Sequence, residues 1–249
     1  MTSEHEAITE RELAAAIAGG EMVVHYQPKI DLKAEAAWHN IGAEALVRWA
    51  HPRRGLIGPG EFIGLAERTG LIRPLTMFVL ETAIDQVRVW RENGTPVSMA
   101  VNLAANLLTD LRMPDQISAM LEKHGVPPSS LILEVTETAA MADTVRAMDI
   151  LTRFRLKGMG LSMDDFGTGY SSLLQLHRMP FSELKIDRSF VTQLGEAQEA
   201  LVMVRSMIHL AHDLGLSVCA EGVETGVALK ILRSLRCDKA QGYYIGRPA

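Results

Sequence analysis

Two adjacent carboxylates, Asp164 and Asp165, end an apolar run in the sequence LSMDDFGTGYSSL (161–173). Two like charges side by side disfavour each other's ionisation unless a cation lies nearby. One interpretation is a solvated strand end that turns at the glycine pair of this segment. The other is a divalent cation, because a bound metal ion is often the largest local charge in its site and favours adjacent carboxylates. The rest of the chain has to distinguish the two.

Ionisable and amide side chains also occur in most of the other short β-rich runs of the chain. They interrupt or end runs made otherwise of Leu, Ile, Val and Met. An unpaired charge buried among such residues carries a large free-energy penalty, so its presence there indicates a role. These residues are Glu44, Asn102, Glu134, Lys185, Glu221 and Gln241. In a barrel of parallel strands the carboxyl ends of the strands meet on one rim, so these side chains would come together there.

Each of these residues also has a purely structural interpretation. Glu44 is equally compatible with a pair to Arg48 on the outer face of a strand, and Asn102 alone would suit a helix cap. Lys185 lies two residues before Asp187, on the same side of a strand, and the two would form an ion pair. Taken together, these alternatives require that several unrelated polar residues fall by chance at the same end of the barrel. We therefore favour a shared site.

The oxygen-rich donor set indicates which metal would bind. Carboxylates and an amide carbonyl without cysteine are hard donors, which suit Mg²⁺ or Mn²⁺ and not Zn²⁺. The two cysteines, Cys219 and Cys237, lack C-x-x-C spacing, and the apolar run around Cys219 favours a buried free thiol. With no disulfide framework, a reducing compartment fits best, so we expect a cytoplasmic location.

Eight β-rich runs alternate with helical patterns along the chain. The predicted strands are 21–28, 42–49, 97–102, 131–137, 160–165, 183–187, 217–223 and 239–245. The helical stripes place apolar residues at i, i+3, i+4 and i+7, as in Leu80, Ala83, Ile84 and Val87. This alternation predicts an α/β fold with a mostly parallel sheet, and eight strands favour a closed (β/α)8 TIM-like barrel over an open doubly wound sheet. The first gap, 29–41, is too polar and irregular to predict a helix.

Length and composition fit a single domain. A chain of 249 residues with 47% hydrophobic residues can bury a large core, and we expect residues 1–249 to form one domain. Within it, Thr9-x-x-Glu12 predicts a capped helix in a lead-in segment, 1–20. The formal net charge of −5 argues against a nucleic-acid polymer as partner. No window reaches the apolar length of a membrane span, and the N-terminus has no secretory-signal pattern.

Several sequence blocks resemble those of a known family. Glu44-Ala45-Leu46, with Arg48 and Trp49, resembles the signature of the EAL-domain cyclic di-GMP phosphodiesterases. Matching blocks occur in order over nearly the whole chain: YQPKIDL, VNLAANLL, LEVTET, DDFGTGYSSL, LKIDRSFV, AEGVE and QGYYIGRP. The resemblance implies a modified TIM barrel with one strand antiparallel to the rest. It also implies hydrolysis of cyclic di-GMP to linear 5′-pGpG with Mg²⁺ or Mn²⁺.

The same resemblance implies roles for single residues. Those that resemble metal ligands, for one or two ions per site, are Glu44, Asn102, Glu134, Asp164 and Asp165. Glu221 resembles the general base or a second-metal contact, and Lys185 resembles the residue that orients the attacking water. Glu137 resembles the glutamate that holds the DDFGTGYSS loop. The positions that resemble substrate contacts are Gln27, Arg48 and Gln241.

Two other functions compete with an active enzyme of this family. Degenerate members bind cyclic di-GMP as inactive receptors, but they typically lack metal ligands or the loop motif, which this chain keeps. A different metal-dependent barrel hydrolase or lyase is the third candidate. The family often dimerises, and sensor or other domains would lie outside this chain. The chain departs from the usual pattern in a longer segment at 31–42 and in Gly64, where proline is common.

Overall fold

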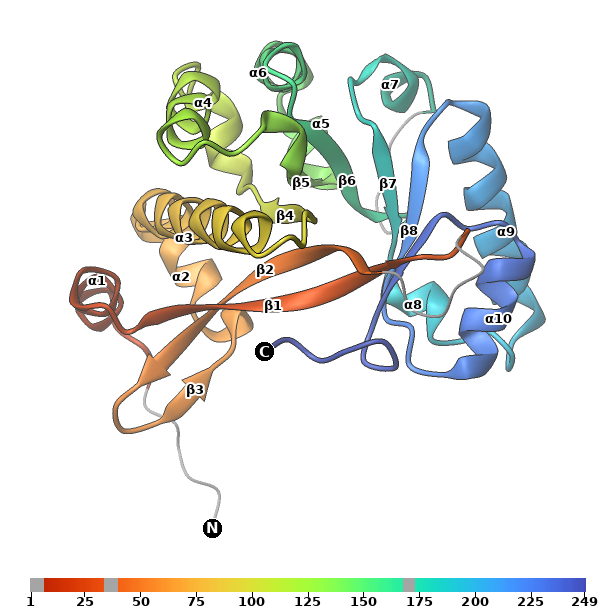
Figure 1. The fold of residues 1–249 in the computed structure, drawn as a ribbon, viewed down its shortest axis with the longest axis horizontal. Helices are drawn as coiled ribbons and strands as arrows, with labels where there is room; N and C mark the ends of the chain where they lie inside the picture. Colours follow the sequence, from red (N-terminus) through yellow and green to blue (C-terminus); the bar gives the residue numbers. More distant parts are fainter. Residues whose placement is uncertain (1–6, 34–39, 168–172) are drawn as a thin grey trace.

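The strands form one sheet that closes on itself. The computed structural model describes residues 7–33, 40–167 and 173–249, and within them the sheet order is β1-β9-β8-β7-β6-β5-β4-β2-β3 with an additional β1–β2 pairing. That pairing closes a barrel, and β3 extends outward from β2 (Figure 1). The strands are β1 (Met22–Asp31), β2 (Asn40–His51), β3 (Gly55–Ile57), β4 (Ser98–Asn102), β5 (Leu131–Thr136), β6 (Gly160–Phe166), β7 (Glu183–Ile186), β8 (Ser217–Ala220) and β9 (Lys239–Gln241).

Within the barrel, β1 runs against both of its neighbours. It pairs antiparallel with β2 and with β9, whereas the neighbours from β2 through β4 to β9 pair in parallel. The prediction of a TIM-like barrel with one reversed strand is therefore confirmed. Because β1 is reversed, residues late in β1 lie near the amino ends of the other strands.

Helices cover the outside of the barrel (Figure 1). They are α1 (Glu10–Gly19), α2 (Ile63–Thr69), α3 (Ile72–Glu92), α4 (Met113–Lys123), α5 (Glu137–Ala142), α6 (Thr144–Leu156), α7 (Leu173–Arg178), α8 (Arg188–Val191), α9 (Gln198–Asp213) and α10 (Gly226–Ser234). Short 3₁₀ turns lie at Pro59–Glu61, Ala105–Thr109 and Pro128–Ser130. The capping box predicted for the first helix is present, since Thr9 and Glu12 bond each other's backbone N–H. The predicted stripe of α3 is buried.

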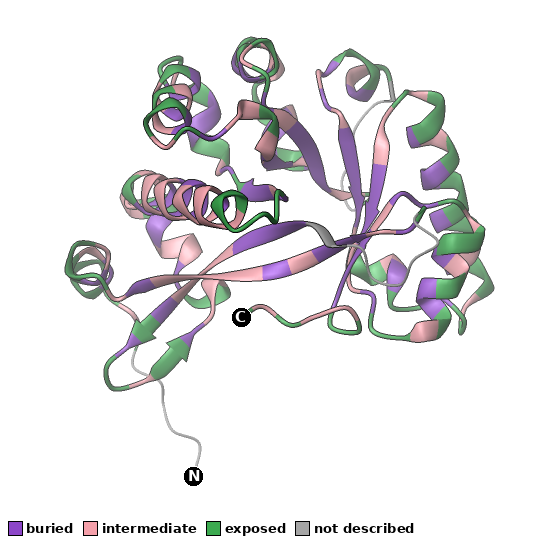
Figure 2. Ribbon diagram, viewed as in Figure 1, coloured by how far each residue is buried: buried purple, intermediate pink, exposed green. Residues whose placement is uncertain are grey.

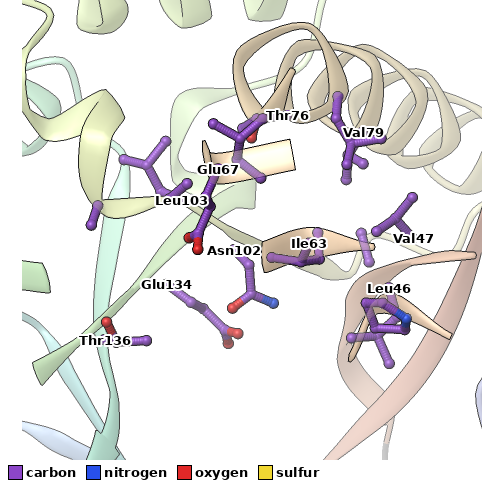
Figure 3. A pocket seen from close by; sticks show the side chains of 16 residues that line it. Leu46, Val47, Ile63, Glu67, Thr76, Val79, Asn102, Leu103, Glu134 and Thr136 are labelled. Atoms are coloured by element: carbon purple, nitrogen blue, oxygen red, sulfur yellow. The ribbon is translucent and has the colours of Figure 1, made fainter. Parts of the chain in front are cut away.

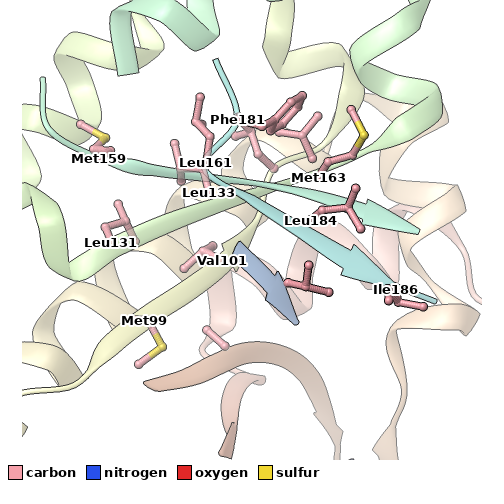
Figure 4. Packing of buried hydrophobic residues seen from close by; sticks show 14 of the residues in the cluster. Met99, Val101, Leu131, Leu133, Met159, Leu161, Met163, Phe181, Leu184 and Ile186 are labelled. Carbon is pink, nitrogen blue, oxygen red and sulfur yellow. The ribbon is translucent and has the colours of Figure 1, made fainter. Parts of the chain in front are cut away.

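The main hydrophobic core lies between the strands and these helices, not inside the barrel. Alternate residues of the parallel strands point outward into it, among them Val101, Leu133 and Met163 (Figure 4). The strands are largely buried and the outer faces of the helices exposed (Figure 2). A smaller cluster under α1 and α2 includes Leu13 and Phe62. The inward positions are thereby left for polar residues.

Eight of the observed strands were predicted, but several end earlier than expected. β5 stops at Thr136, whose hydroxyl accepts a bond from Ala139 N–H and caps α5. β8 stops at Ala220, and two residues later Gly222 takes a φ of 67°, which is not an extended conformation. β3 was not predicted. The longer 31–42 segment lies partly outside the described residues, at 34–39.

Candidate active site

The polar residues predicted from the sequence meet inside the barrel, at the carboxyl ends of the parallel strands. The register places Gln27 opposite Glu44, and Asn102 opposite Glu134. Contacts then cross the barrel between side chains of non-neighbouring strands, so these side chains point inward. The residues brought together in this way are Gln27, Glu44, Asn102, Glu134, Asp164, Lys185, Glu221 and Gln241.

Lys185 is the cation that these carboxylates share. Its side chain is 1% exposed, and its Nζ lies 2.5 Å from Glu221 Oε1, 2.6 Å from Glu134 Oε2 and 3.1 Å from Asp164 Oδ1. A fourth carboxylate, Glu44, is 3.9 Å away. Although burial alone would lower the pKa of Lys185, these carboxylates raise it well above its usual value. The ammonium group is therefore held charged at the centre of the site.

Glu134 is bonded by two lysines at once. Lys185 binds its Oε2, and Lys29 of β1 binds its Oε1, each at 2.6 Å. Burial would raise the pKa of Glu134, but the two ammonium groups outweigh burial and lower that pKa to about 2. Glu134 is therefore an anion although its side chain is excluded from water.

Side-chain amides fix Glu44. Asn102 Nδ2 donates to its Oε1, and Gln241 Nε2 donates to its Oε2, both at 2.7 Å. Gln241 Nε2 also donates to Gln27 Oε1 at 2.9 Å. Burial raises the pKa of Glu44 above its usual value, and the nearby Glu134 carboxylate raises it further. Gln241 Oε1 is buried and is an acceptor without a donor among the described residues, so the site offers it to an incoming group.

A β-bulge turns Asp164 and Asp165 toward the same site. In a regular strand adjacent side chains point to opposite faces. Here the register with β7 shifts between Met163 and Phe166, and Asp165 takes a φ of 56°, which is unusual for any residue other than glycine. As a result, one carboxylate oxygen each from Asp164, Asp165 and Glu221 lies within 4.8 Å of the other two. Strained backbone of this kind is typical of functional sites.

The surroundings of Glu221 favour its protonated form. Burial raises the pKa of Glu221 to about 8, and the carboxylates of Asp164, Glu44 and Glu134 add to this against the opposing effect of Lys185. Burial and Asp164 likewise raise the pKa of Asp165. The cluster therefore carries more negative charge than Lys185 and Lys29 offset, and such a site attracts cations.

Two hollows adjoin these groups. One, of about 250 Å³, holds Asp164, Lys185 and Glu221 among its lining residues. The other, of about 330 Å³, has mostly apolar walls and reaches Asn102 and Glu134 between β2, β4 and α3 (Figure 3). Leu46 lines both. A ligand with an anionic part and a flat apolar part would fit this combination.

The structural interpretations left open by the sequence are not the ones observed. Asp187 does not pair with Lys185, because it caps α8 through a bond from Ser189 N–H. Asn102 bonds Glu44 and caps no helix. Arg48 does not pair with Glu44 either; its guanidinium donates to the carbonyl oxygen of Val47.

Two predicted residues lie outside the carboxylate cluster. Arg48 is on the same strand face as Glu44, four residues on, but lines neither hollow. Glu137 is buried at the first position of α5 and accepts a 3.2 Å bond from Gly167 N–H. Gly167 precedes residues 168–172, which lie outside the described residues, so the rest of that loop is not described.

Lys29, Arg188 and Tyr243 adjoin the site but were not predicted from the sequence. Arg188 and Tyr243 line the hollow that contains Lys185, and they belong to the family-like blocks LKIDRSFV and QGYYIGRP, although the resemblance assigned neither of them a role. The position of Lys29, in contrast, could have been predicted from its spacing. It lies two residues after Gln27 in one strand, so both side chains point to the same face.

A family model and individual relatives match this arrangement. The EAL domain model matches residues 10–248. The chain belongs to the EAL domain family. It is 44% identical over 238 residues to the bifunctional diguanylate cyclase/cyclic di-GMP phosphodiesterase MucR of Pseudomonas aeruginosa, a match that covers 95% of this chain and 34% of that protein. It is 42% identical to the cyclic di-GMP phosphodiesterase NbdA of the same organism, over all of this chain and 31% of that protein.

Solved structures of EAL proteins have the same fold. The PaMucR phosphodiesterase in complex with c-di-GMP matches with a TM-score of 0.90 and 43% identity over 96% of both chains. The cAMP- and cyclic-di-GMP-bound form of the EAL enzyme Bd1971 also matches with a TM-score of 0.90, at 32% identity, over 96% of this chain and 65% of that one. This EAL chain spans about a third of the length of the curated relatives it matches. None of its described helices is both long and apolar enough to cross a bilayer.

Proposed function

We propose that this EAL domain hydrolyses cyclic di-GMP to linear 5′-pGpG with the help of Mg²⁺ or Mn²⁺. The observation that carries the proposal is the position of Lys185, within 3.1 Å of carboxylate oxygens from three different strands or strand ends at the mouth of the barrel. Family membership and relatives that are named cyclic di-GMP phosphodiesterases support the substrate. The complete set of predicted polar residues supports an active enzyme over an inactive receptor.

The residues present fit a hard divalent cation. The candidate ligands are the oxygens of Glu44, Asn102, Glu134, Asp164 and Asp165, and oxygen donors of this kind suit Mg²⁺ and Mn²⁺. Two features of the site support the fit: the three carboxylates within 4.8 Å of one another, and the buried acceptor of Gln241 that has no donor among the described residues. When bound, one or two such ions offset the negative charge of a phosphodiester and acidify a water.

The protein's own side chains would do the remaining work. Glu221, with its raised pKa, takes a proton from the attacking water once it is ionised, and Lys185 orients that water beside it. Gln27, Gln241 and Arg48 contact the dinucleotide at the mouth. The apolar hollow beside Asn102 and Glu134 takes the flat face of a base.

Glu137 and Gly167 supply the loop contact expected for this function. By accepting the Gly167 N–H bond, the buried Glu137 fixes the start of the segment that follows the two aspartates. In this proposal it acts by positioning and touches no reacting atom.

A direct assay tests the proposal. The protein is incubated with cyclic di-GMP and either Mg²⁺ or Mn²⁺, and the products are separated by chromatography. We expect pGpG to appear with either ion and to disappear when EDTA removes it. Tight binding of cyclic di-GMP by fully metallated protein without any product would overturn the proposal in favour of a receptor.

Binding of the metal should release a proton. Near pH 7 the ion meets a cluster in which Glu221, with a pKa of about 8, is largely protonated. Metal ligands must give up their protons, and a cation lowers the pKa of each carboxyl nearby, so we expect release of about one proton per site. Calorimetry of Mn²⁺ binding in buffers of different ionisation enthalpy measures it. The release should vanish well above pH 8, and an enthalpy independent of the buffer at pH 7 would contradict this expectation.

The wider setting of the domain is also proposed. Because the chain spans about a third of its curated relatives, we place it beside sensor or other domains in a longer protein. The two buried free cysteines suit a reducing compartment, which supports the cytoplasm. A homodimer is proposed from the family resemblance.

A further inference from the structure

A buried lysine outside the predicted site lies against Glu134. Lys29 is 3% exposed and belongs to the reversed strand β1. It follows Gln27 by two residues on the same strand face, and it lies opposite Gly42, near the amino end of β2, and opposite Gln241, the last residue of β9. From there its Nζ crosses the barrel to Glu134 Oε1 at 2.6 Å. The only cation at the other oxygen of this carboxylate, among the described residues, is Lys185.

The two carboxylate oxygens of Glu134 therefore have different partners. Oε1 is held by Lys29 on the inner side, and Oε2 is turned to the mouth, where Lys185, Asp164 and Glu221 lie. Glu134 is 1% exposed, so bulk solvent does not reach either oxygen. A buried carboxylate that loses one partner must rotate, or remain with an unsatisfied oxygen. The geometry at Oε1 therefore controls the direction of Oε2.

We propose that Lys29 is a positioning residue that fixes Glu134 so that its Oε2 faces the divalent cation. This inference rests on the proposed metal site. Hydrogen-bond partners that orient a ligating carboxylate usually set metal affinity, and their loss costs roughly ten- to a hundredfold in affinity or activity. Lys29 touches no reacting atom and acts through Glu134 alone.

The barrel supplies a matched control. Lys239 of β9 binds Glu183 Oε2 at 2.6 Å, and Ser162 donates to the other oxygen of Glu183. This is a lysine–glutamate pair of equal length in the same barrel, with no contact to Glu134. The Lys239 side chain is 24% exposed against 4% for Lys29, so Lys239→Met controls for the loss of a lysine from such a pair and not for its depth of burial.

The test compares three variants by calorimetric titration with Mn²⁺ alone, in the absence of dinucleotide, and by thermal unfolding. Lys29→Met removes the donor and should weaken Mn²⁺ binding about ten- to a hundredfold. Lys29→Gln offers a neutral N–H donor on a side chain one atom shorter, which reaches Oε1 after a small shift of Glu134, and it should bind Mn²⁺ more tightly than Lys29→Met. Lys239→Met should lower the unfolding temperature and leave Mn²⁺ affinity at the wild-type value.

Other outcomes would overturn the inference. Wild-type or tighter Mn²⁺ binding by folded Lys29→Met would show that Lys29 only neutralises charge or supports the fold. If Lys29→Gln and Lys29→Met weaken Mn²⁺ binding equally, the charge of Lys29 matters and its orientation of Glu134 does not. If Lys29→Met does not fold, wild-type affinity in Lys29→Gln supports a donor at this position and weakened affinity there contradicts it. If the variants show the expected Mn²⁺ affinities but the wild-type protein does not hydrolyse cyclic di-GMP, the proposed substrate is wrong and the role of Lys29 remains supported.

Discussion

Replacing Lys185 with methionine should abolish most hydrolysis of cyclic di-GMP and destabilise the metal-free protein at the same time. The ammonium group is 1% exposed and lies within 3.1 Å of three carboxylates, so its removal leaves buried negative charges without a partner. Breaking a buried ion pair in this way costs about 3–5 kcal/mol of unfolding free energy. Loss of one preorganised charged group at a reacting phosphate costs roughly a hundred- to a thousandfold in rate.

The stability loss in Lys185→Met should depend on metal. A divalent cation binds the folded state only, and the carboxylates left by Lys185 attract it more strongly, so Mn²⁺ should restore much of the lost stability. Urea unfolding with EDTA and with saturating Mn²⁺ measures both values. Lys239→Met serves as the control, because its pair with Glu183 lies outside the cluster and Mn²⁺ should not rescue it preferentially. Equal Mn²⁺ stabilisation of Lys185→Met and Lys239→Met would contradict a shared role of Lys185 and metal as counter-ions.

The strands and the rim residues were predictable because each rests on a short local pattern. Short β-rich runs predicted the strands, and a charged or amide residue in such a run is a strong signal, since burial penalises it. Glu44, Glu134 and Lys185 are found by that argument, and the structure brings all three together. The same argument explains why the inside of this barrel is polar and the apolar core lies outside it.

Other features depend on geometry that a local pattern does not contain. The pair of Lys29 and Glu134 joins residues 105 positions apart, on two strands that are not neighbours in the sheet, so no local pattern links them. The bulge at Asp165 depends on its register with β7. The short strand β3, Gly55–Ile57, has too few residues to show a period.

The early end of β8 concerns function directly. The sequence run 217–223 reads as one strand, yet the strand ends at Ala220 and Glu221 follows it. Gly222 combines a φ of 67° with the close approach of Arg188, whose Cβ would lie 2.4 Å from a Cβ added at Gly222. The glycine therefore permits the turn that leaves Glu221 at the mouth, in reach of Lys185.

Replacing Glu221 with glutamine should lower hydrolysis by about a hundred- to ten-thousandfold, the range expected for removing a general base. Glutamine has nearly the same shape, so the fold should be retained, and Glu199→Gln on the exposed face of α9 controls for the chemical change. Activity of Glu221→Gln within a fewfold of the wild type would remove Glu221 from the role of base.

The raised pKa of Glu221 also predicts how Glu221→Gln changes the stability of the protein. Burial places the pKa of Glu221 near 8 in the folded protein, against 4.5 for the free group. The folded state then holds the proton more tightly, so the contribution of this group to stability is complete below about pH 4.5 and is lost as the pH rises to 8. Glutamine does not titrate, so metal-free Glu221→Gln should gain stability over the wild type across this interval, by at most about 1.4 kcal/mol per pH unit. Urea unfolding with EDTA at several pH values measures the difference, and a difference that shrinks with rising pH would show that Lys185 outweighs burial at Glu221.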